Sequence, residues 1–312
     1  MTKNIIITGG AGFIGSHLVN FLLKTKNKVF VIDDLTTGSI KNINFKSKNI
    51  KFIKGDCAKD KILDQLPKIQ FDILYHIAGQ SSGEISFENP LNDFNRNLLS
   101  TLKLCQFCVK RKIKKIVYAS SMSVYGDLKN KKYKANESLN CDPLSFYGVS
   151  KLCSEFYLKQ FSKLGLKYTI LRLFNVYGPN QDFKNLKQGM ISIYLGQLLK
   201  SNKVFVKGKL NRFRDFIYID DVVKILIGCL INSRTGNKIY NISTGKKTFI
   251  NKILYLIKKY SKKKFQIIKR KGTPGDQFGI YSIPMKAKND FNIKKFIKIE
   301  DGLKKMINSI NQ

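Results

Sequence analysis

The sequence predicts an α/β protein built on a doubly wound parallel sheet, with a smaller C-terminal α/β lobe. Short, continuous apolar runs alternate with helical patterns through the first half of the chain. A glycine-rich stretch directly follows the first apolar run, and the alternation loosens after about residue 175. Continuous apolar strands between amphipathic helices are typical of a parallel sheet that helices cover on both faces.

Six strands are expected in this first half. Their ranges are 4–8, 28–33, 50–56, 72–79, 115–120 and 168–175. Apolar residues at helical spacing predict helices at 13–25 and at about 61–67, 94–112 and 147–164. Right-handed crossovers through these helices give a doubly wound sheet.

The second half predicts helices at 189–201 and 220–233, with short strands between them. Residues 246–312 mix helices and short strands. We therefore expect one domain at 1–174, to which residues 216–244 return. Residues 175–215 and 245–312 are expected to form the second lobe.

Composition limits the class of protein. The 312 residues carry a net charge of +36, but only seven of the 57 basic residues are arginines and the lysines are spread along the chain. The basic residues of a nucleic-acid-binding surface would be clustered, so no nucleic-acid partner is expected. No apolar run approaches the roughly 20 residues of a membrane helix, and no secretion signal precedes the first strand. We expect a cytoplasmic protein without a membrane partner, whose charge attracts phosphorylated small molecules.

Metal chemistry is not expected. Cys105 and Cys108 form a C-x-x-C on a helical pattern, without a second pair or a nearby histidine to complete a zinc site. The chain has only two histidines, His17 and His76, so catalysis should not depend on histidine.

The glycine-rich stretch "ITGGAGFIGSHL" (7–18) predicts a dinucleotide site of the Rossmann type. Gly9, Gly12 and Gly15 lie between the first strand and the first helix. Residues without a Cβ allow a tight turn and let backbone N–H groups approach a pyrophosphate at the helix N-terminus.

Three aspartates at strand ends indicate which dinucleotide binds. Asp33 and Asp34 end the second strand, where a carboxylate accepts hydrogen bonds from ribose hydroxyls and repels a 2′-phosphate. This favours NAD over NADP. Asp56 ends the third strand and is expected to reach the adenine, although G-D is also ordinary turn chemistry.

Tyr147 and Lys151 are four residues apart on a predicted helix and therefore share one face. We expect the lysine ammonium and an oxidised nicotinamide to lower the pKa of the phenol, so that it can accept a proton from a carbinol. The serine-rich segment "SSMS" (120–123) at the end of a strand offers a hydroxyl to hold the same oxygen.

Together "TGGAGFIGSHL", "SSMSVYG", "YGVSK", "RLFNVYGPNQ" and "RDFIYIDDV" resemble the extended short-chain dehydrogenase/reductases, in their nucleotide-sugar epimerase/dehydratase branch. The resemblance covers nearly the whole chain. It implies that Ser121 is the catalytic hydroxyl, Tyr147 the general base and Lys151 its partner on the nicotinamide ribose.

The resemblance also implies binding residues. Asn97 lies near the cofactor, Asn175 near the sugar nucleotide, and Arg214 on its pyrophosphate, unless Arg214 forms a surface ion pair with Asp215 or Asp220. Beside these motifs, the other expected cofactor residues are Phe13, Ile14, Cys57, Ala78, Gly79 and Gln80. The other expected substrate residues are Ser81, Ser82, Glu84, Met122, Ser123 and Arg270.

Two departures from the family pattern concern the tail. Ile283 and Pro284 stand where the family usually has an acid. The second phosphate-binding cation is either Arg270 or Lys271, and the nucleotide base, uridine or guanosine, stays open.

Met122 narrows the chemistry. Family members that dehydrate the sugar place an acid two residues after the catalytic hydroxyl, where this chain has Met122 and Ser123. Methionine cannot transfer a proton and a serine hydroxyl is a poor acid, so a 4,6-dehydratase is disfavoured.

The leading hypothesis is an NAD-dependent 4-epimerase of a UDP- or GDP-linked sugar. The alternative is a C4 dehydrogenase, for example of a GDP-heptose, which would release NADH. A non-catalytic binding protein is a third hypothesis, disfavoured by the intact Ser121, Tyr147 and Lys151.

The polar loop expected at 78–90 could contact the sugar or simply be solvated. A homodimer through the helices at about 94–112 and 147–164 is also expected.

Overall fold

The computed structural model describes residues 2–310. Its centre is a seven-stranded sheet in the order β12-β7-β5-β4-β1-β2-β3, in which every neighbouring pair is parallel. The strands are β1 (Asn4–Thr8), β2 (Lys28–Asp33), β3 (Ile50–Lys54), β4 (Ile73–His76), β5 (Lys115–Ser121), β7 (Lys167–Leu173) and β12 (Lys238–Ile242). The strand order reverses between β1 and β4, and ligands of such sheets bind at that point, beyond the carboxyl ends of the strands.

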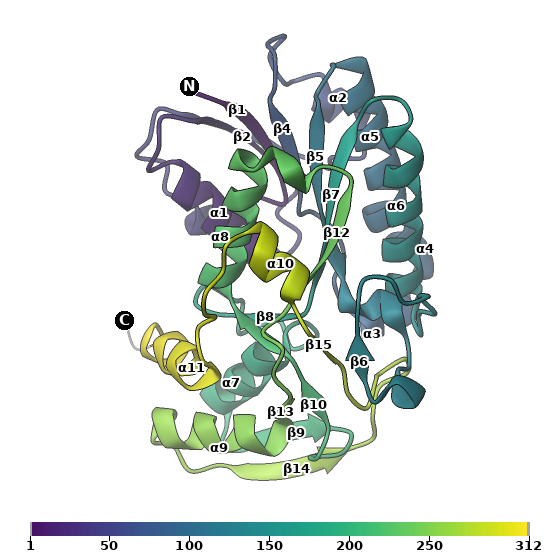
Figure 1. Cartoon of the computed structure of the whole chain (residues 1–312). Coiled ribbons are helices and arrows are strands. Elements are labelled where there is room, and N and C mark those ends of the chain that lie inside the picture. The colour runs from purple at the N-terminus through teal and green to yellow at the C-terminus, as the bar shows by residue number, and fades with distance from the viewer. Residues whose placement is uncertain (1, 311–312) are drawn as a thin grey trace.

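Helices cover both faces of this sheet (Figure 1). One face packs against α1 (Phe13–Leu22), α8 (Ile219–Ile231) and α10 (Met285–Asp290). The other face packs against α2 (Asp60–Leu63), α5 (Ser100–Lys110) and α6 (Phe146–Ser162). The strands have fully buried apolar side chains on both faces, as Ile5, Ile6 and Ile7 of β1 show. The predicted doubly wound α/β fold is confirmed.

The smaller lobe lies beyond the carboxyl ends of the strands (Figure 1). Its core joins side chains of α7 (Met190–Lys200), α9 (Ile250–Ser261) and α11 (Ile299–Asn308). The short strands outside the central sheet pair two by two: β14 (Gln266–Arg270) with β9 (Lys203–Lys207), β10 (Phe213–Arg214) with β13 (Thr248–Phe249), β11 (Phe216–Tyr218) with β8 (Asn175–Tyr177), and β15 (Tyr281–Ser282) with β6 (Lys134–Ala135).

Two local differences from the predictions affect the site. The segment 78–90, expected as a loop, contains the helix α3 (Gly83–Glu88), whose N-cap is the Ser82 side chain. The helix expected at about 94–112 is composite, running through α4 (Pro90–Phe94), a π-helical turn η2 (Asn95–Leu99) and α5. No helix within residues 2–310 combines the length and apolar character needed to span a membrane.

Candidate active site

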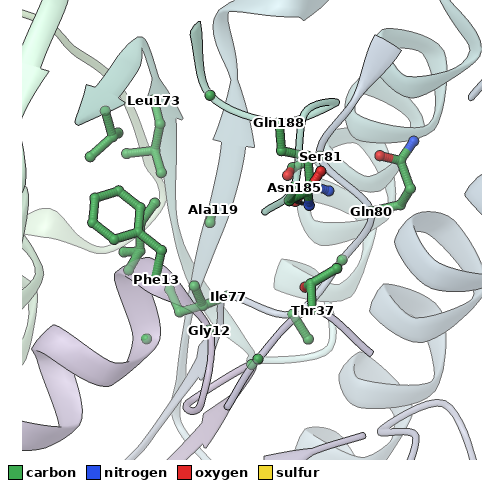
Figure 2. A pocket seen from close by; sticks show the side chains of 18 of the residues that line it. Gly12, Phe13, Thr37, Ile77, Gln80, Ser81, Ala119, Leu173, Asn185 and Gln188 are labelled. Atoms are coloured by element: carbon green, nitrogen blue, oxygen red, sulfur yellow. Dashed lines mark hydrogen bonds between the residues drawn. The ribbon is translucent and has the colours of Figure 1, made fainter. Parts of the chain in front are cut away.

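Two adjoining hollows open beyond the carboxyl ends of the strands. The larger measures about 900 Å³ and is lined by the turn after β1 and by the ends of β2, β4, β5 and β7. The smaller measures about 630 Å³ and lies between α3 and the lobe. They share lining residues, among them Ser81, Met122, Ser123, Asn175 and Gln188. Figure 2 shows Phe13 and Leu173 on one side of the larger hollow and Ser81, Asn185 and Gln188 on the other.

The glycine turn packs so closely against neighbouring backbone that it leaves no room for side chains at Gly9 and Gly15. Gly9 has φ +71°, and a Cβ there would lie 2.6 Å from the Ala78 backbone nitrogen. A Cβ on Gly15 would overlap the Gly9 carbonyl oxygen. The helix α1 begins at Phe13 directly after this turn, so its free N–H groups face the hollow. Gly9, Gly12, Phe13, Ile14 and Gly15 all line it, as expected of an anion-binding turn.

The carboxylates at the ends of β2 and β3 also line the larger hollow. Asp33 accepts the Ala11 and Leu35 N–H groups, each at 2.8 Å, so it also holds the glycine turn in place. Burial raises the pKa of Asp33. Asp34 forms an ion pair with Arg96 at 2.8 Å. Although burial opposes it, hydrogen bonds from Thr36 and Arg96 lower the pKa of Asp34.

Several residues expected to bind the cofactor lie in the segments after β3 and β4. Ala78, Gly79, Gln80 and Ser81 line the larger hollow, as do Asp56 and Cys57. The Gln80 side chain, however, donates to Asp93 at 2.8 Å and to the Ser82 carbonyl at 2.7 Å. In Figure 2 its amide points toward the neighbouring helices. The Gln80 amide therefore already donates its hydrogen bonds to other groups of the protein.

Asn97, expected near the cofactor, lies behind the residues that line the larger hollow. It is fully buried, is not among the lining residues, and its Nδ2 donates to Asp93 at 3.0 Å. Its Oδ1 has no hydrogen-bond partner and lies 2.4 Å from the position that a Cβ of Gly79 would take. Gly79 thus separates Asn97 from the hollow and lets its carbonyl oxygen approach closely.

Ser121, Tyr147 and Lys151 come together at the wall of the larger hollow. Ser121 ends β5, and its hydroxyl accepts the Ser123 N–H at 3.1 Å. Lys151 Nζ donates to the Ala119 carbonyl at 2.9 Å and lies 5.9 Å from the centre of the Tyr147 ring. Burial lowers the pKa of Lys151 to about 8.

The expectation that Lys151 and an oxidised nicotinamide together lower the pKa of Tyr147 stays a prediction, and in the protein alone burial acts in the opposite direction. Burial raises the pKa of Tyr147 to about 12, and the Ser121 hydroxyl only partly offsets this effect. In the protein alone the Tyr147 phenol is therefore neutral at physiological pH, even with the Lys151 ammonium nearby.

Polar and sulfur-containing side chains form the junction between the hollows. Asn175, at the start of β8, donates from Nδ2 to Met122 Sδ at 3.4 Å and to the Asp215 carbonyl at 3.3 Å. Met122 and Ser123 are followed by buried residues, so no acid side chain follows Ser121 within this turn.

Ion pairs between side chains line the smaller hollow. Glu84 forms one with Lys207 at 2.6 Å across the gap between α3 and β9. Arg214 donates to Asp276 at 2.5 Å and to the Gln277 carbonyl at 2.6 Å, and Arg212 pairs with the same carboxylate. Arg214 is buried and does not form the alternative surface pair with Asp215 or Asp220.

Of the two tail cations, Arg270 lines the smaller hollow, where its guanidinium lies 5.0 Å from the centre of the Phe205 ring, whereas Lys271 is not a lining residue. Ser82 and Glu84 also line this hollow. The sequence did not single out Arg96, Lys187, Lys207, Arg212 or Asp276. One signal was available, because Arg212 and Arg214 are two of only seven arginines and lie two residues apart.

The sheet order and the glycine cradle define a dinucleotide-binding α/β protein. Residues 5–243 match the NAD dependent epimerase/dehydratase family, and the chain belongs to this family.

The relatives agree with this assignment. A putative UDP-glucose 4-epimerase of Methanocaldococcus jannaschii is 38% identical over 309 residues, with 97% of each chain covered. The UDP-N-acetylglucosamine 4-epimerase of Methanobrevibacter ruminantium, solved with UDP-N-acetylmuramic acid, is 31% identical with a TM-score of 0.90, covering 99% of this chain and 98% of that one. The UDP-glucose 4-epimerase of Thermus thermophilus, solved with NAD, is 28% identical with a TM-score of 0.89, and 99% of each chain is covered.

NAD is the cofactor of this enzyme. The chain fits it, because Gly9, Gly12 and Gly15 line the larger hollow at the N-terminus of α1. A Cβ on Gly9 or Gly15 would collide with neighbouring backbone atoms and displace this turn. Asp33 and Asp34 place two carboxylates where ribose hydroxyls are read.

Proposed function

We propose that the protein is an NAD-dependent UDP-sugar 4-epimerase. The observation that carries the proposal is the position of Ser121, Tyr147 and Lys151. They line the larger hollow next to Met122 and Ser123, which line both hollows. A cofactor in the larger hollow and a sugar nucleotide in the smaller one would meet at these side chains. The similarity to UDP-sugar 4-epimerases supports the same conclusion.

Each side chain has a distinct role in this proposal. Bound NAD supplies the hydride acceptor and a positively charged ring. Tyr147 accepts the proton of the C4 hydroxyl and later returns it, while Ser121 holds the same oxygen by a hydrogen bond. Lys151 binds the nicotinamide ribose, and its charge and that of the ring together oppose the effect of burial on Tyr147.

The arginines of the smaller hollow provide the diphosphate site in this proposal. Arg212, Arg214 and Arg270 come from β14 and from the segment around β10, and planar guanidinium groups suit phosphate oxygens. The sugar would then extend from this cluster toward Met122. Because Met122 and Ser123 follow Ser121, the ketone is reduced again rather than dehydrated.

The test offers the purified protein UDP-glucose, UDP-N-acetylglucosamine, UDP-glucuronic acid and GDP-mannose in turn. Conversion to the C4 epimer, followed by NMR, without lasting absorbance of reduced nicotinamide, supports the proposal. NADH that accumulates until an acceptor is added would replace it with a C4 dehydrogenase. A 4-keto-6-deoxy product would replace it with a dehydratase, and binding without turnover would overturn it.

We also propose a homodimer, formed through the helical segments α4–α5 and α6. Phe94, Val149 and Phe156 are apolar side chains on these segments that are about half exposed. Burying such side chains against a second copy is favourable. In light scattering at micromolar concentration we expect twice the 35.7 kDa of one chain, and Phe156→Asp should give the monomer. A monomeric wild-type protein would contradict the proposal.

A further inference from the structure

Asp93 is a buried carboxylate for which the mechanism above has no use. It lies on α4, behind the wall of the larger hollow, and is 1% exposed. A buried carboxylate needs hydrogen-bond donors or a countercharge, because burial disfavours its ionised form.

Three neutral groups donate to this carboxylate. They are Ser150 Oγ at 2.6 Å, Gln80 Nε2 at 2.8 Å and Asn97 Nδ2 at 3.0 Å. The donors come from three elements of the cofactor site: α6, the segment after β4, and η2. Within residues 2–310 no lysine or arginine forms an ion pair with Asp93.

The hydrogen bond to Asn97 fixes the direction of its amide. With Nδ2 on Asp93, the unpartnered Oδ1 faces Gly79. A Cβ on Gly79 would contact Asn97 Oδ1 and would also lie 3.3 Å from Lys151 Nζ. The Asn97 carbonyl and the Lys151 ammonium therefore flank the same glycine. Gln80, whose amide points to the helices in Figure 2, is held by the same carboxylate.

The other carboxylate near Lys151 already has a cation. Glu155, one turn further along α6, pairs with Arg172 at 2.7 Å and accepts the Ser120 hydroxyl at 2.6 Å. Glu155 also raises the pKa of Lys151, but less than Asp93 does, because Arg172 already pairs with it. The remaining titratable neighbours of Lys151 are Tyr147 on α6, Tyr118 on β5 and His76 on β4.

We propose that Asp93 is a positioning residue of the active site, which orients Gln80 and Asn97 and serves as the countercharge of Lys151. The charge of Asp93 raises the pKa of Lys151 and so opposes the effect of burial, which brings that pKa down to about 8. His76 has a pKa of about 3 and is neutral near pH 7, so it adds no positive charge beside Lys151. The proposal rests on the proposed role of Lys151 at the cofactor.

The test measures the Lys151 ammonium directly and needs no turnover. The NAD-free protein is treated with acetic anhydride over a range of pH, and acetylation of Lys151 is followed by peptide mass spectrometry with the exposed Lys304 as internal reference. We expect Asp93→Asn to move the midpoint for Lys151 down by about one pH unit or more, because a nearby opposite charge is lost. An unchanged midpoint in folded Asp93→Asn protein would overturn the proposal.

Two matched variants separate charge from packing. Ser150→Ala removes the 2.6 Å hydrogen bond but keeps the carboxylate, so the midpoint should stay close to that of the wild type. Asp221→Asn changes another buried aspartate, at the start of α8, and should leave the midpoint unchanged. A shift in either variant as large as in Asp93→Asn would contradict the countercharge role.

If Asp93→Asn does not fold, Asp93→Ser removes the charge with less bulk and decides the question in the same way. Lack of epimerase activity in the wild type would remove the proposed function but leave this measurement valid.

Discussion

Different interactions hold the two hollows in shape. The larger one is shaped mainly by backbone, by glycines and by side chains that backbone groups hold in place, as Ala11 and Leu35 hold Asp33. It also carries a side-chain ion pair, between Asp34 and Arg96. The smaller one is held by side-chain ion pairs between distant segments, such as Glu84 with Lys207 and Arg214 with Asp276.

This difference implies different sensitivities. Backbone geometry at the end of a buried sheet depends on packing and responds little to ionic strength. Partly exposed ion pairs weaken as salt screens them. Substitutions that fill space should therefore damage the larger hollow, and salt should weaken the smaller one.

Tyr147→Phe should have the largest effect on turnover. It tests the position where the proposed cofactor and sugar sites meet. Without the phenol the sugar hydroxyl has no proton acceptor, so turnover should fall at least about a hundredfold while NAD stays bound. Turnover is measured with the epimerising UDP-sugar, and NAD content is measured after denaturation. Tyr157→Phe, on the exposed side of the same helix, is the matched control. Undiminished turnover in Tyr147→Phe would remove Tyr147 from the mechanism.

Gly15→Ala tests the larger hollow. The added methyl group overlaps the Gly9 carbonyl oxygen, so the turn must move and NAD affinity should fall about fiftyfold, about 2.3 kcal/mol. Titration calorimetry measures the affinity. Gly272→Ala is the control, because the nearest atom to its added Cβ is 3.9 Å away. Equal NAD affinity in the two variants would show that the turn is not a tight cradle.

Acid should destabilise the region behind the larger hollow through His76, which contacts Thr8 and Thr101 and is fully buried. Burial lowers the pKa of His76 from 6.5 to about 3, so between these values the unfolded state binds the proton and the folded state does not. Its contribution to stability is complete above pH 6.5 and is lost as pH falls toward 3. At pH 5 the loss is about 2 kcal/mol.

The measurement is urea unfolding at pH 7, 6 and 5. His76→Gln should lower stability at pH 7 but flatten its fall in acid. Asp215, beside the smaller hollow, acts in the opposite direction, because burial raises its pKa from 3.8 to about 6 and its contribution is lost as pH rises through this window. Asp215→Asn should therefore make the acid loss steeper. Parallel pH profiles for wild type and His76→Gln would contradict the role of His76.

Salt should have the smallest effect, and it should act on the smaller hollow. Raising NaCl from about 0.05 to about 0.5 M should increase KM for the UDP-sugar about threefold to tenfold and change NAD affinity less than about twofold. Glu84→Gln should reduce this salt dependence. Glu300→Gln, which breaks a surface pair with Lys252 in the lobe, should leave it unchanged. Equal salt effects on both ligands would remove the distinction between the hollows.

The same difference explains how much the sequence could predict. The parallel sheet, the glycine turn and the Ser121, Tyr147 and Lys151 positions each depend on a local stretch attached to a strand or helix, so local patterns identify them. The ion pairs of the smaller hollow join residues more than 60 positions apart, and one lysine among many carries no local signal. The direction of the Tyr147 pKa shift depends on burial by the whole fold, and no motif reports that. The helix α3 was missed because Gly83 and nearby polar residues resemble a loop.

The last strand of the sheet has a consequence for how the chain is made. β12 pairs with β7, yet more than sixty residues, including α7 of the lobe and the sheet-covering helix α8, separate them in sequence. During synthesis, which proceeds at about 5–20 residues per second, the outer edge of β7 therefore stays open for several seconds. An unpaired strand edge is a template for association with other chains. Slow synthesis between residues 174 and 237, or a truncation before Lys238, should therefore leave the nascent protein prone to aggregation before any substrate is met.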